Sequence, residues 1–411
     1  MADVAPHSEL SDRLRALPGI EQLLPALEGL EQCFLVGGAV RDLLLGAETV
    51  DLDVAVEGNA EAVALHLAER LGGEVRAHGR FGTATVRAPG IQVDLATARS
   101  ETYPEPGALP DVEPATLDED LGRRDFTVNA MAMSLSHDRL GEIKDPHGGR
   151  EDLDARVIRV LHKASFVDDP TRLLRAARYA TRFGFALETD TERLAREAAT
   201  AAALDTVSGP RVRDELIDLL AEEGAPDAVG MLRRLGVAAG LHPSLGMDPE
   251  LVASAKLGAM ETAADPAHAA LAALCLGDPE ELEPWIDRLG LAAGARDAVL
   301  RAARRGPGLA EELRRELRPS ELHALLAPEP PESLALALAL GAPADRVLDF
   351  VSRLCAVRLE ITGADLLAAG VPESPALGEA LEQTLTAKLD GKVTGLDDEL
   401  RMALDIARAE A

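Results

Sequence analysis

The spacing of apolar residues divides the chain into two regions of different structure. Near the start, an apolar run at 34–36 ends at two glycines, which is typical of a buried strand that runs into a turn. A helical Ala/Leu period follows at 60–71 and ends at Gly72 and Gly73, as expected for a glycine-capped helix. Further strand-like runs lie at 74–76, 83–86 and 91–95. This order predicts an α/β head in which helices cover a mixed sheet.

From about residue 190 the pattern is helical throughout. The residues are mainly Ala, Leu, Glu and Arg at helical spacing, interrupted by turns that contain Pro or Gly. No heptad repeat persists, so we expect a helical body and not a coiled coil. We therefore predict three parts, which are an α/β head at 1–145, an all-α neck at 146–215, and a helical body and tail at 216–411.

Composition places the protein in a broad class. A chain of 411 residues with 47% hydrophobic residues is globular and long enough for more than one domain. The three cysteines, Cys33, Cys275 and Cys355, lie far apart and lack metal-ligand spacing, which indicates a reducing compartment. The start of the chain lacks the basic and apolar parts of a secretion signal, and no apolar run reaches the roughly 20 residues of a membrane span. We expect a soluble cytoplasmic protein that does not contact membranes. The sequence does not indicate its oligomeric state.

The net charge of −29 argues against general nucleic-acid binding, because Lys and Arg supply most of that affinity by neutralising phosphates. The distribution of charge weakens this objection, since arginines gather within one short segment. They are Arg150, Arg156, Arg159, Arg172, Arg175, Arg178 and Arg182. A local basic surface on an acidic protein is therefore still compatible with a nucleic-acid substrate.

The first candidate for chemistry is the glycine pair at Gly37 and Gly38, between the strand at 34–36 and a short helical pattern. Glycines let backbone N–H groups approach a phosphate, and the dipole of the following helix favours negative charge. Arg41, on the first helical turn, can add a forked donor. An ordinary turn is the alternative, and the glycines alone do not exclude it.

The second candidate is a set of carboxylates on strands. Asp51 and Asp53 are two residues apart, so on a strand they share one face. Two such carboxylates repel each other unless a divalent cation bridges them, and hard oxygen ligands suit Mg2+. Asp94, in the run at 91–95, offers a third carboxylate of the kind that a two-metal phosphoryl-transfer site needs. Solvated aspartates at strand ends are the alternative.

Two segments follow that bear on a nucleotide. The segment 99–110 is rich in Pro and Gly, so we expect a mobile loop without regular structure beside the site. Arg124 and Asp125 lie in the run Arg-Arg-Asp-Phe-Thr-Val-Asn-Ala at 123–130. An arginine can bind a phosphate there, and the adjacent aspartate can accept a hydrogen bond from a ribose hydroxyl.

The segment 165–179 combines a helix start with a stripe of arginines. Asp169 precedes a proline, which is a good helix N-cap signal by itself. That signal does not explain Arg172, Arg175 and Arg178, which recur every three residues and project from neighbouring positions of one stripe. Asp169 can accept from an exocyclic amine while Arg172 donates to the adjacent ring nitrogen. Cytosine and adenine both present this donor and acceptor, whereas uracil and guanine do not.

The order of these motifs resembles the nucleotidyltransferase fold of the DNA polymerase β superfamily. It more closely resembles the class II tRNA CCA-adding enzymes and their poly(A) polymerase relatives. The match is tight over about 34–185, where the run at 123–130 fits the family motif R-R-D-F-T-x-N-A, and loose after that. The resemblance implies a polymerase β-type head followed by helical neck, body and tail. It also implies template-independent addition of nucleotides from CTP and ATP to the 3′ end of tRNA, with Mg2+ as cofactor.

The resemblance also assigns roles to residues. It places metals on Asp51 and Asp53, an acidic residue at Asp94, the nucleotide on Arg124 and its sugar on Asp125, and base recognition in the neck helix that carries Asp169 and Arg172. The nucleotide-binding residues expected on these grounds are Gly37, Gly38, Arg41, Arg124, Asp125, Asp169, Arg172, Arg175 and Arg178. Two alternatives remain open, namely a poly(A) polymerase that acts on general RNA and a catalytically silent RNA-binding protein that reuses the fold.

The segment after Arg99 departs from the pattern of complete CCA-adding enzymes. In those, an acidic residue and an aromatic residue precede an Asp-Gly-Arg-Arg-Pro run. Here Glu101 and Tyr103 are present, but the segment 104–110 replaces the arginine pair. This version resembles the subgroup that adds only the terminal A, while a separate enzyme adds CC. A proline-rich segment samples fewer backbone states, so it restricts the rearrangement that would switch a pocket from C to A.

Overall fold

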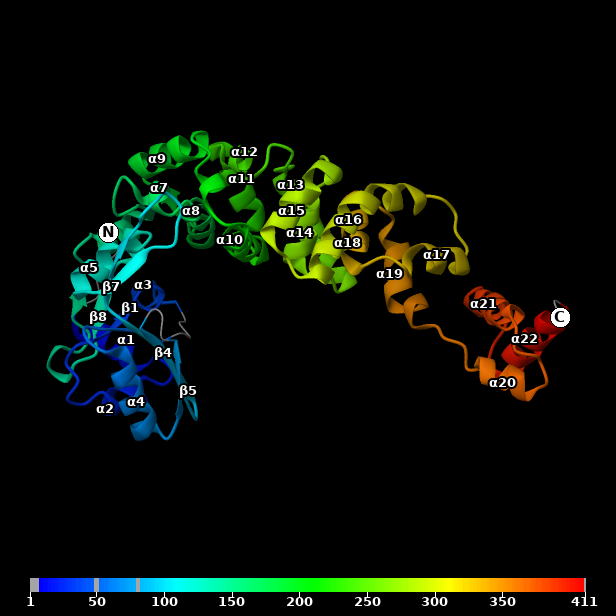
Figure 1. The fold of residues 1–411 in the computed structure, drawn as a ribbon, viewed down its shortest axis with the longest axis horizontal. Helices are drawn as coiled ribbons and strands as arrows, with labels where there is room; N and C mark the ends of the chain where they lie inside the picture. The colour runs from blue at the N-terminus through cyan, green and yellow to red at the C-terminus, as the bar shows by residue number, and fades with distance from the viewer. Residues whose placement is uncertain (1–6, 48–51, 79–81, 410–411) are drawn as a thin grey trace. The chain divides into compact units, whose positions relative to one another are not determined.

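The computed structural model describes residues 7–47, 52–78 and 82–409, and these fall into two units (Figure 1). The first unit comprises Met1–Glu215 and Met231–Leu241, and the second comprises Leu216–Gly230 and His242–Ala411. The head and neck expected from the sequence therefore belong to one unit, and their expected limit at residue 145 stays a prediction. No helix among the described residues is long and apolar enough to cross a membrane.

A seven-stranded sheet forms the centre of the first unit, in the order β3-β4-β5-β2-β1-β8-β9. Its strands are β1 (Cys33–Val36), β2 (Leu52–Val56), β3 (Glu74–His78), β4 (Thr83–Ala88), β5 (Ile91–Thr97), β8 (Ala132–Ser134) and β9 (Ile143–Lys144). The pairing of β2 with β5 is parallel, and the other pairings in this sheet are antiparallel. The expected mixed sheet is thus confirmed, and the three strand-like runs at 74–95 are strands in it.

Helices pack on this sheet because their apolar residues lie on one side. Helix α4 (Ala60–Leu71) begins at Asn59, whose side chain accepts the N–H of Ala62 at 3.1 Å, and ends at Gly72 with φ 66°. It packs against β4 and β5 through a buried side that includes Leu67. Helix α3 (Gly38–Leu45) follows β1 directly. The helix expected at 60–71 is confirmed residue for residue.

The segment 99–110 differs from the sequence prediction. We expected no regular structure there, but β6 (Arg99–Thr102) pairs with β7 (Asp111–Pro114) in an antiparallel ribbon. The reason is the placement of the prolines. Pro104, Pro106 and Pro110 all lie in the connection between the two strands, where a missing N–H removes no ladder hydrogen bond. We call residues 99–114 the ribbon.

The rest of the first unit is mainly helical. A short parallel pair, β10 (Val157–Ile158) with β11 (Ala186–Leu187), joins two of its segments. The other helices of its described residues are α1 (His7–Arg15), α2 (Ile20–Ala26), α5 (Leu117–Gly122), α6 (Gly149–Ala155), α7 (Ser165–Asp168), α8 (Arg172–Phe183), α9 (Thr189–Thr200) and α12 (Val237–Leu241). Helices α10 (Gly209–Ala221) and α11 (Ala225–Leu235) have residues in both units.

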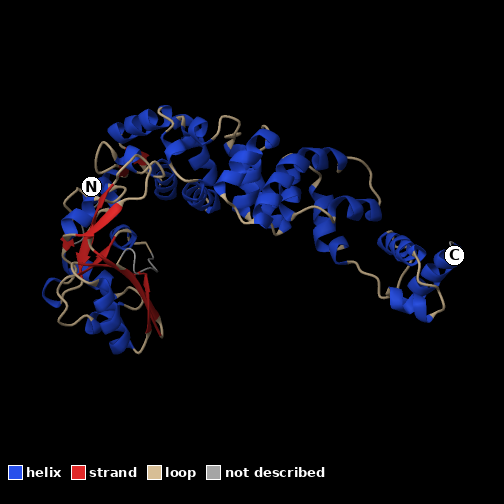
Figure 2. Cartoon of the chain, in the orientation of Figure 1, coloured by secondary structure: helices blue, strands red, loops and turns tan. Residues whose placement is uncertain are grey.

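The described residues of the second unit form helices joined by loops, without any strand, as Figure 2 shows. They are α13 (Pro249–Thr262), α14 (Pro266–Leu274), α15 (Pro279–Leu289), α16 (Ala293–Glu312), α17 (Pro319–Leu326), α18 (Pro331–Ala339), α19 (Ala344–Ser352), α20 (Gly363–Ala368), α21 (Pro375–Leu389) and α22 (Leu396–Ala409). Leucine and alanine dominate its buried clusters. The expected helical body is confirmed.

Candidate active site

A cavity of about 440 Å³ in the first unit gathers most of the expected site residues. It is lined by Gly37, Gly38, Arg41, Asp53, Glu101, Tyr103, Arg123, Arg124, Asp125, Asn129, Asp169, Arg172, Arg175 and Tyr179. Asp94 and Arg178 are not among these residues. Segments distant in the sequence therefore contribute to one cavity, with the glycine turn and the start of the α8 helix both on its wall.

The glycine turn requires glycine for two reasons. Gly37 has φ 68° and ψ −130°, which disfavours residues with a side chain. A Cβ atom at this position would also lie 2.9 Å from Nη1 of Arg124. Helix α3 begins at Gly38 without a side-chain cap, so its first N–H groups remain available to a ligand. This geometry is that of an anion site at a helix start.

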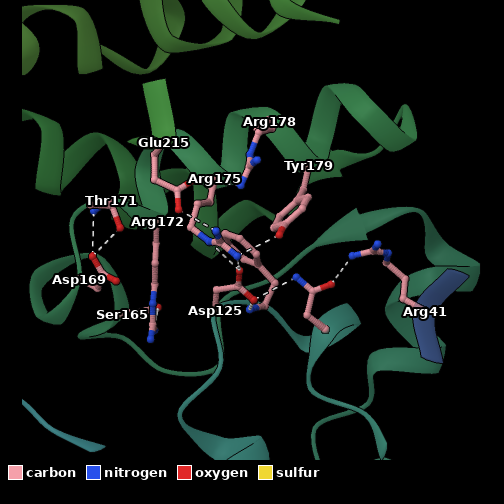
Figure 3. Close-up of polar contacts among 12 residues, drawn as sticks. Arg41, Asp125, Ser165, Asp169, Thr171, Arg172, Arg175, Arg178, Tyr179 and Glu215 are labelled. Carbon is pink, nitrogen blue, oxygen red and sulfur yellow. Dashed lines mark hydrogen bonds and ion pairs between the residues drawn. The ribbon is translucent and has the colours of Figure 1, made fainter. Parts of the chain in front are cut away.

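Arg41 lines the cavity but is engaged with protein groups. Its Nε donates to Oδ1 of Asp42 at 2.8 Å. Its Nη1 donates to Oδ1 of Asn129 at 2.6 Å, and Figure 3 draws this bond as the dashed line from Arg41. Its guanidinium lies 4.4 Å from the centre of the Phe183 ring, and the residue is only 5% exposed. Arg41 therefore orients Asn129, and its expected contact with phosphate stays a prediction.

Two of the three expected carboxylates lie side by side on the sheet. Asp53 of β2 is the direct parallel partner of Asp94 of β5, and each has buried apolar neighbours before and after it in its strand. The two side chains thus share the face opposite the core. Asp94 accepts a 2.5 Å hydrogen bond from Thr85. Asp51 lies outside the described residues.

This carboxylate pair fits a hard cation in its chemistry. Both side chains offer oxygen ligands of the type that Mg2+ prefers, with water completing its coordination. The described residues contain no group of three or more His, Cys, Asp or Glu arranged to hold a metal. Asp53 and Asp94 are therefore candidate ligands, and a third ligand would have to come from elsewhere, for which Asp51 is the candidate from the sequence.

Asp120 anchors the arginine pair. Its Oδ1 accepts Nε and Nη2 of Arg123 at 2.9 and 2.7 Å, and its Oδ2 accepts Nη2 of Arg124 at 2.9 Å. Burial alone would raise the pKa of Asp120, but the two guanidinium groups outweigh burial and lower it. Nη1 of Arg123 also donates to Glu101 of the ribbon at 2.8 Å. The side chain of Asp120 thus fixes both arginines against the cavity wall.

Asp125 is joined to the α8 helix by Arg175. Oδ2 of Asp125 accepts Nε and Nη2 of Arg175 at 2.9 and 2.8 Å, and Oδ1 accepts the amide of Asn129 at 3.0 Å (Figure 3). Burial alone would raise the pKa of Asp125, but Arg175 and Asn129 lower it. Arg175 and Arg178 both bind Glu215. Asp125 is therefore ionised at neutral pH, and an ionised carboxylate can accept a hydrogen bond from a sugar hydroxyl.

Asp169 and Arg172 both line the cavity, and their expected role in recognising the base stays a prediction. Oδ1 of Asp169 accepts both the N–H and the hydroxyl of Thr171, at 3.1 and 2.6 Å (Figure 3). Arg172 is 4% exposed, and it donates to Oγ of Ser165 at 2.7 Å and to the carbonyl of Arg123 at 2.8 Å. Both side chains are thus held in place before any base arrives.

The expected N-cap at Asp169 is displaced by two residues. Helix α7 ends at Asp168, and α8 begins at Arg172 with Thr171 as its N-cap. The Asp169 carboxylate accepts the N–H of Thr171, two residues on, and residues 170–171 form a turn before Arg172, the first residue of α8.

Five lining residues were not among the expected site residues, namely Glu101, Tyr103, Arg123, Asn129 and Tyr179. Arg123 and Asn129 belong to the run at 123–130, so the motif itself was a signal for them. Tyr103 donates to Glu101 at 3.2 Å, and burial raises the pKa of Tyr103 to about 12. Tyr179 lies one helical turn after Arg175, which donates to its hydroxyl at 2.9 Å, and only this spacing could have indicated it.

Two family models match parts of this chain. Residues 33–159 match the family described as Poly A polymerase head domain. Residues 184–247 match the family described as Probable RNA and SrmB- binding site of polymerase A. The first match contains the glycine turn, Asp53, Asp94 and the run at 123–130.

Relatives match over most of the chain. An A-adding tRNA nucleotidyltransferase of Halalkalibacterium halodurans is 33% identical over 98% of this chain and 95% of its own length. One of the same name from Geobacter sulfurreducens is 36% identical over 91% of this chain but 45% of its own length, so this chain spans less than half of that relative. A CC-adding tRNA nucleotidyltransferase of Deinococcus radiodurans is 36% identical over 89% of this chain and 87% of its own length.

Solved structures give the same family. The apo form II of a CCA-adding enzyme has a TM-score of 0.83 and 33% identity, covering 97% of this chain and 98% of that one. A CCA-adding enzyme with ATP has a TM-score of 0.81 and 31% identity, covering 98% and 96%. The Thermotoga maritima CCA-adding enzyme complexed with tRNA has a TM-score of 0.78 and 30% identity, covering 98% of each chain. The chain therefore belongs to the tRNA nucleotidyltransferase family whose members are named as A-adding, CC-adding and CCA-adding enzymes.

Proposed function

We propose that this chain is a nucleotidyltransferase that extends the 3′ end of tRNA within its terminal CCA sequence, using ATP and releasing pyrophosphate. One observation carries this proposal. A single cavity combines an anion site at Gly37 and Gly38, a carboxylate at Asp53, and a hydrogen-bonding pair at Asp169 and Arg172. These are the parts needed to bind a triphosphate, support transfer at its α-phosphate and recognise its base.

In the proposed reaction the 3′-hydroxyl oxygen of tRNA forms a bond to the α-phosphorus of the nucleotide. The bond between this phosphorus and the bridging oxygen to the β-phosphate breaks, and pyrophosphate leaves. The start of α3 and Arg124 would bind the triphosphate, and Asp125 would accept a hydrogen bond from the ribose. Held by Asp53 with Asp51 and Asp94, Mg2+ would supply Lewis-acid chemistry at the phosphate oxygens. Positioning and charge neutralisation account for most of the rate in reactions of this type.

The base would be recognised by protein groups, without a nucleic-acid template. Asp169 would accept the exocyclic amine, and Arg172 would donate to the neighbouring ring nitrogen. Adenine and cytosine fit this pair, while uracil and guanine would place a carbonyl oxygen opposite Asp169. Arg172 keeps its orientation through Ser165 and the carbonyl of Arg123, so the donor is preorganised.

Within this activity we propose a specialist for the terminal A. Two observations support it. The ribbon carries Glu101 and Tyr103 but has a proline-rich connection where complete CCA-adding enzymes have an arginine pair. Two of the relatives that match along most of this chain are named as A-adding, although two others that match a similar share of it are named as CC-adding. CTP would then be a poor substrate.

The experiment compares RNA substrates. We expect the purified protein, with Mg2+ and ATP, to extend a tRNA transcript that ends in CC by one nucleotide. An unstructured RNA oligonucleotide with the same 3′ end should remain unextended. Repeated extension of the oligonucleotide would support a poly(A) polymerase instead. Binding of tRNA without any incorporation would support a silent RNA-binding protein, and incorporation that persists in EDTA would rule out the metal-dependent mechanism.

A further inference from the structure

Arg211 of α10 connects the ribbon to the base-recognising carboxylate. Its Nη1 donates to the carbonyl of Gly107 at 2.8 Å, and its Nη2 donates to Oδ1 of Asp169 at 2.8 Å. Gly107 lies in the connection between β6 and β7, so one guanidinium contacts both the tip of the ribbon and the neck. Because guanidinium is planar and rigid, these two hydrogen bonds fix the distance between the two acceptors.

The tip of the ribbon is held against the neck by two further features. The N–H of Gly107 donates to the carbonyl of Asp168 at 3.2 Å. Gly107 has φ 72°, and a Cβ atom there would collide with Oγ1 of Thr206 and lie 2.9 Å from the Thr206 carbonyl oxygen. The neck therefore leaves room only for glycine at this point. Gly107 contacts Asp168, Thr206 and Arg211 of the neck.

Asp169 is consequently held in one orientation. Its Oδ1 accepts three hydrogen bonds, two from Thr171 and one from Arg211, as Figure 3 shows for the Thr171 pair. Its Oδ2 accepts none from the described residues and is the oxygen left for the amine of a base. Rotation of the carboxylate to a new position would break all three bonds at Oδ1.

A carboxylate with a fixed position favours one size of base. Adenine and cytosine present the same donor and acceptor, but in adenine the imidazole ring lies between this edge and the sugar. The edge of adenine therefore lies farther from the ribose than the edge of cytosine. With the ribose held at Asp125, a carboxylate that cannot move meets only one of these edges at hydrogen-bond distance.

Arg211 also lies where helix electrostatics would not place it. It is in the first turn of α10, which contains no acidic residue, and a cation at a helix N-terminus is unfavourable. Its side chain is 24% exposed. The two acceptors at Gly107 and Asp169 give a reason for an arginine at this position.

We propose that Arg211 is a positioning residue for base specificity: by joining the tip of the ribbon to Asp169, it holds this carboxylate in a single position and restricts the site to one base size. This inference rests on the proposed nucleotide transfer to tRNA. It differs from a role in folding, because it requires the preference between ATP and CTP to change more than the rate with the preferred nucleotide does.

The test measures kcat/KM for ATP and for CTP on one tRNA transcript that ends in CC. In Arg211→Gln we expect the ATP/CTP ratio to fall at least tenfold, mainly through a lower KM for CTP. In Gly107→Ala the added methyl group would collide with Thr206 and displace the tip of the ribbon. This variant should therefore lower the ATP/CTP ratio by a similar factor. Because both changes act through one contact, the double variant should lower the ratio no further than the larger single change.

Three control variants separate positioning from charge, backbone strain and folding. Arg211→Lys keeps the charge but cannot donate to both acceptors from a planar group. Its ATP/CTP ratio should therefore be as low as that of Arg211→Gln. Gly148→Ala introduces a side chain at the same φ of 72° with nothing within 4 Å, and it should leave the ratio unchanged. So should Arg193→Gln, whose partners Asp190 and Glu197 are exposed on α9.

Several results would overturn the inference. One is an unchanged ATP/CTP ratio in folded Arg211→Gln and Gly107→Ala proteins, even if both rates fall. Others are restoration of the wild-type ratio by Arg211→Lys, and a wild-type ratio near one. If the wild-type protein transferred neither nucleotide to tRNA, the proposed function itself would fail, which is a distinct outcome.

Discussion

Asp53 lies directly opposite Asp94 in the parallel pairing of β2 with β5, and the two carboxylates share the face of the sheet that is turned away from the core. Two ionised carboxylates at paired positions of neighbouring strands repel each other unless a cation lies between or beside them. The strand that carries Asp53 also pairs with β1, which ends directly before the glycine turn. The sheet therefore places Asp53 and the glycine turn on one cavity.

We predict that Asp53→Asn lowers incorporation of AMP by about 10³-fold, because loss of a metal ligand removes several kcal/mol of charge stabilisation. Binding of tRNA, measured by filter retention, should stay within about twofold, since the amide is isosteric. Glu74→Gln is a suitable control, since Glu74 is an exposed carboxylate on β3 of the same sheet. Near-normal turnover by Asp53→Asn would show that Asp53 does not bind a metal that the reaction needs.

A second prediction concerns the glycine turn. Gly37→Ala should raise the KM for ATP at least tenfold, because the methyl group strains the backbone and displaces Arg124. Gly46→Ala changes the other end of the same helix, at φ 70° and with no atom nearer than 3.9 Å. It should cost some stability but leave the KM for ATP unchanged. Equal KM values for the two variants would show that the turn does not bind the triphosphate.

A third prediction uses the buried carboxylate that holds the arginine pair. Asp120→Asn should lower the free energy of unfolding of the first unit by about 3 kcal/mol at pH 7, because Arg123 and Arg124 lose a buried counter-charge. Asp118→Asn on the same helix should cost less than about 1 kcal/mol, since its ion pair with Lys144 is exposed. Urea unfolding followed by tyrosine emission reports this unit, because both tyrosines lie in it.

The loss of stability in Asp120→Asn is also expected to depend on pH. The pKa of Asp120 in the folded state lies below its ordinary value of 3.8. The stabilisation by this group is therefore fully present above pH 3.8 and is lost as pH falls through the lower folded pKa. The difference between wild type and Asp120→Asn should be constant from pH 7 to pH 5 and shrink below pH 3.8. A difference that grows on acidification would contradict the assigned ion pairs.

The fourth prediction separates base recognition from helix capping at Asp169. Asp169→Ala should relax selection against UTP and GTP at least tenfold while changing the melting temperature by only a few degrees, because Thr171 and not Asp169 is the N-cap of α8. Asp168→Ala provides a neighbouring control, since Oδ2 of Asp168 lies 3.8 Å from Nδ1 of His162 and both side chains are partly exposed. Lower stability with unchanged selectivity would favour a purely structural role.

Local signals in the sequence were enough for part of the fold and site. The helix at 60–71 has a cap at each end in the chain itself, so its limits were predictable. The glycine turn follows β1, in which every residue is buried, and Asp53 is the one exposed residue among the buried residues of β2. Such patterns can be recognised without knowing which strands pair. The ribbon was missed because its strands are only four residues long and depend on pairing across the prolines.

Contacts between distant segments could not be predicted. Arg41 was expected at a phosphate, yet its guanidinium is engaged by Asp42, Asn129 and Phe183, one of them 142 residues away in a helix of the neck. Arg211 had no motif around it, and its two acceptors lie 104 and 42 residues away. Such residues carry no periodicity or spacing signal, so only the folded arrangement shows that they contact the site.

Addition of the terminal A is tested with three tRNA transcripts, which end before CCA, after C and after CC. Each is incubated with the purified protein and Mg2+, with CTP, ATP or both, and the products are resolved to single nucleotides. We expect extension only of the CC-ended transcript, by one nucleotide and with ATP. Efficient extension of the first transcript to a complete CCA end would contradict the specialist for the terminal A, and extension of no transcript with any nucleotide would contradict nucleotide transfer to tRNA altogether.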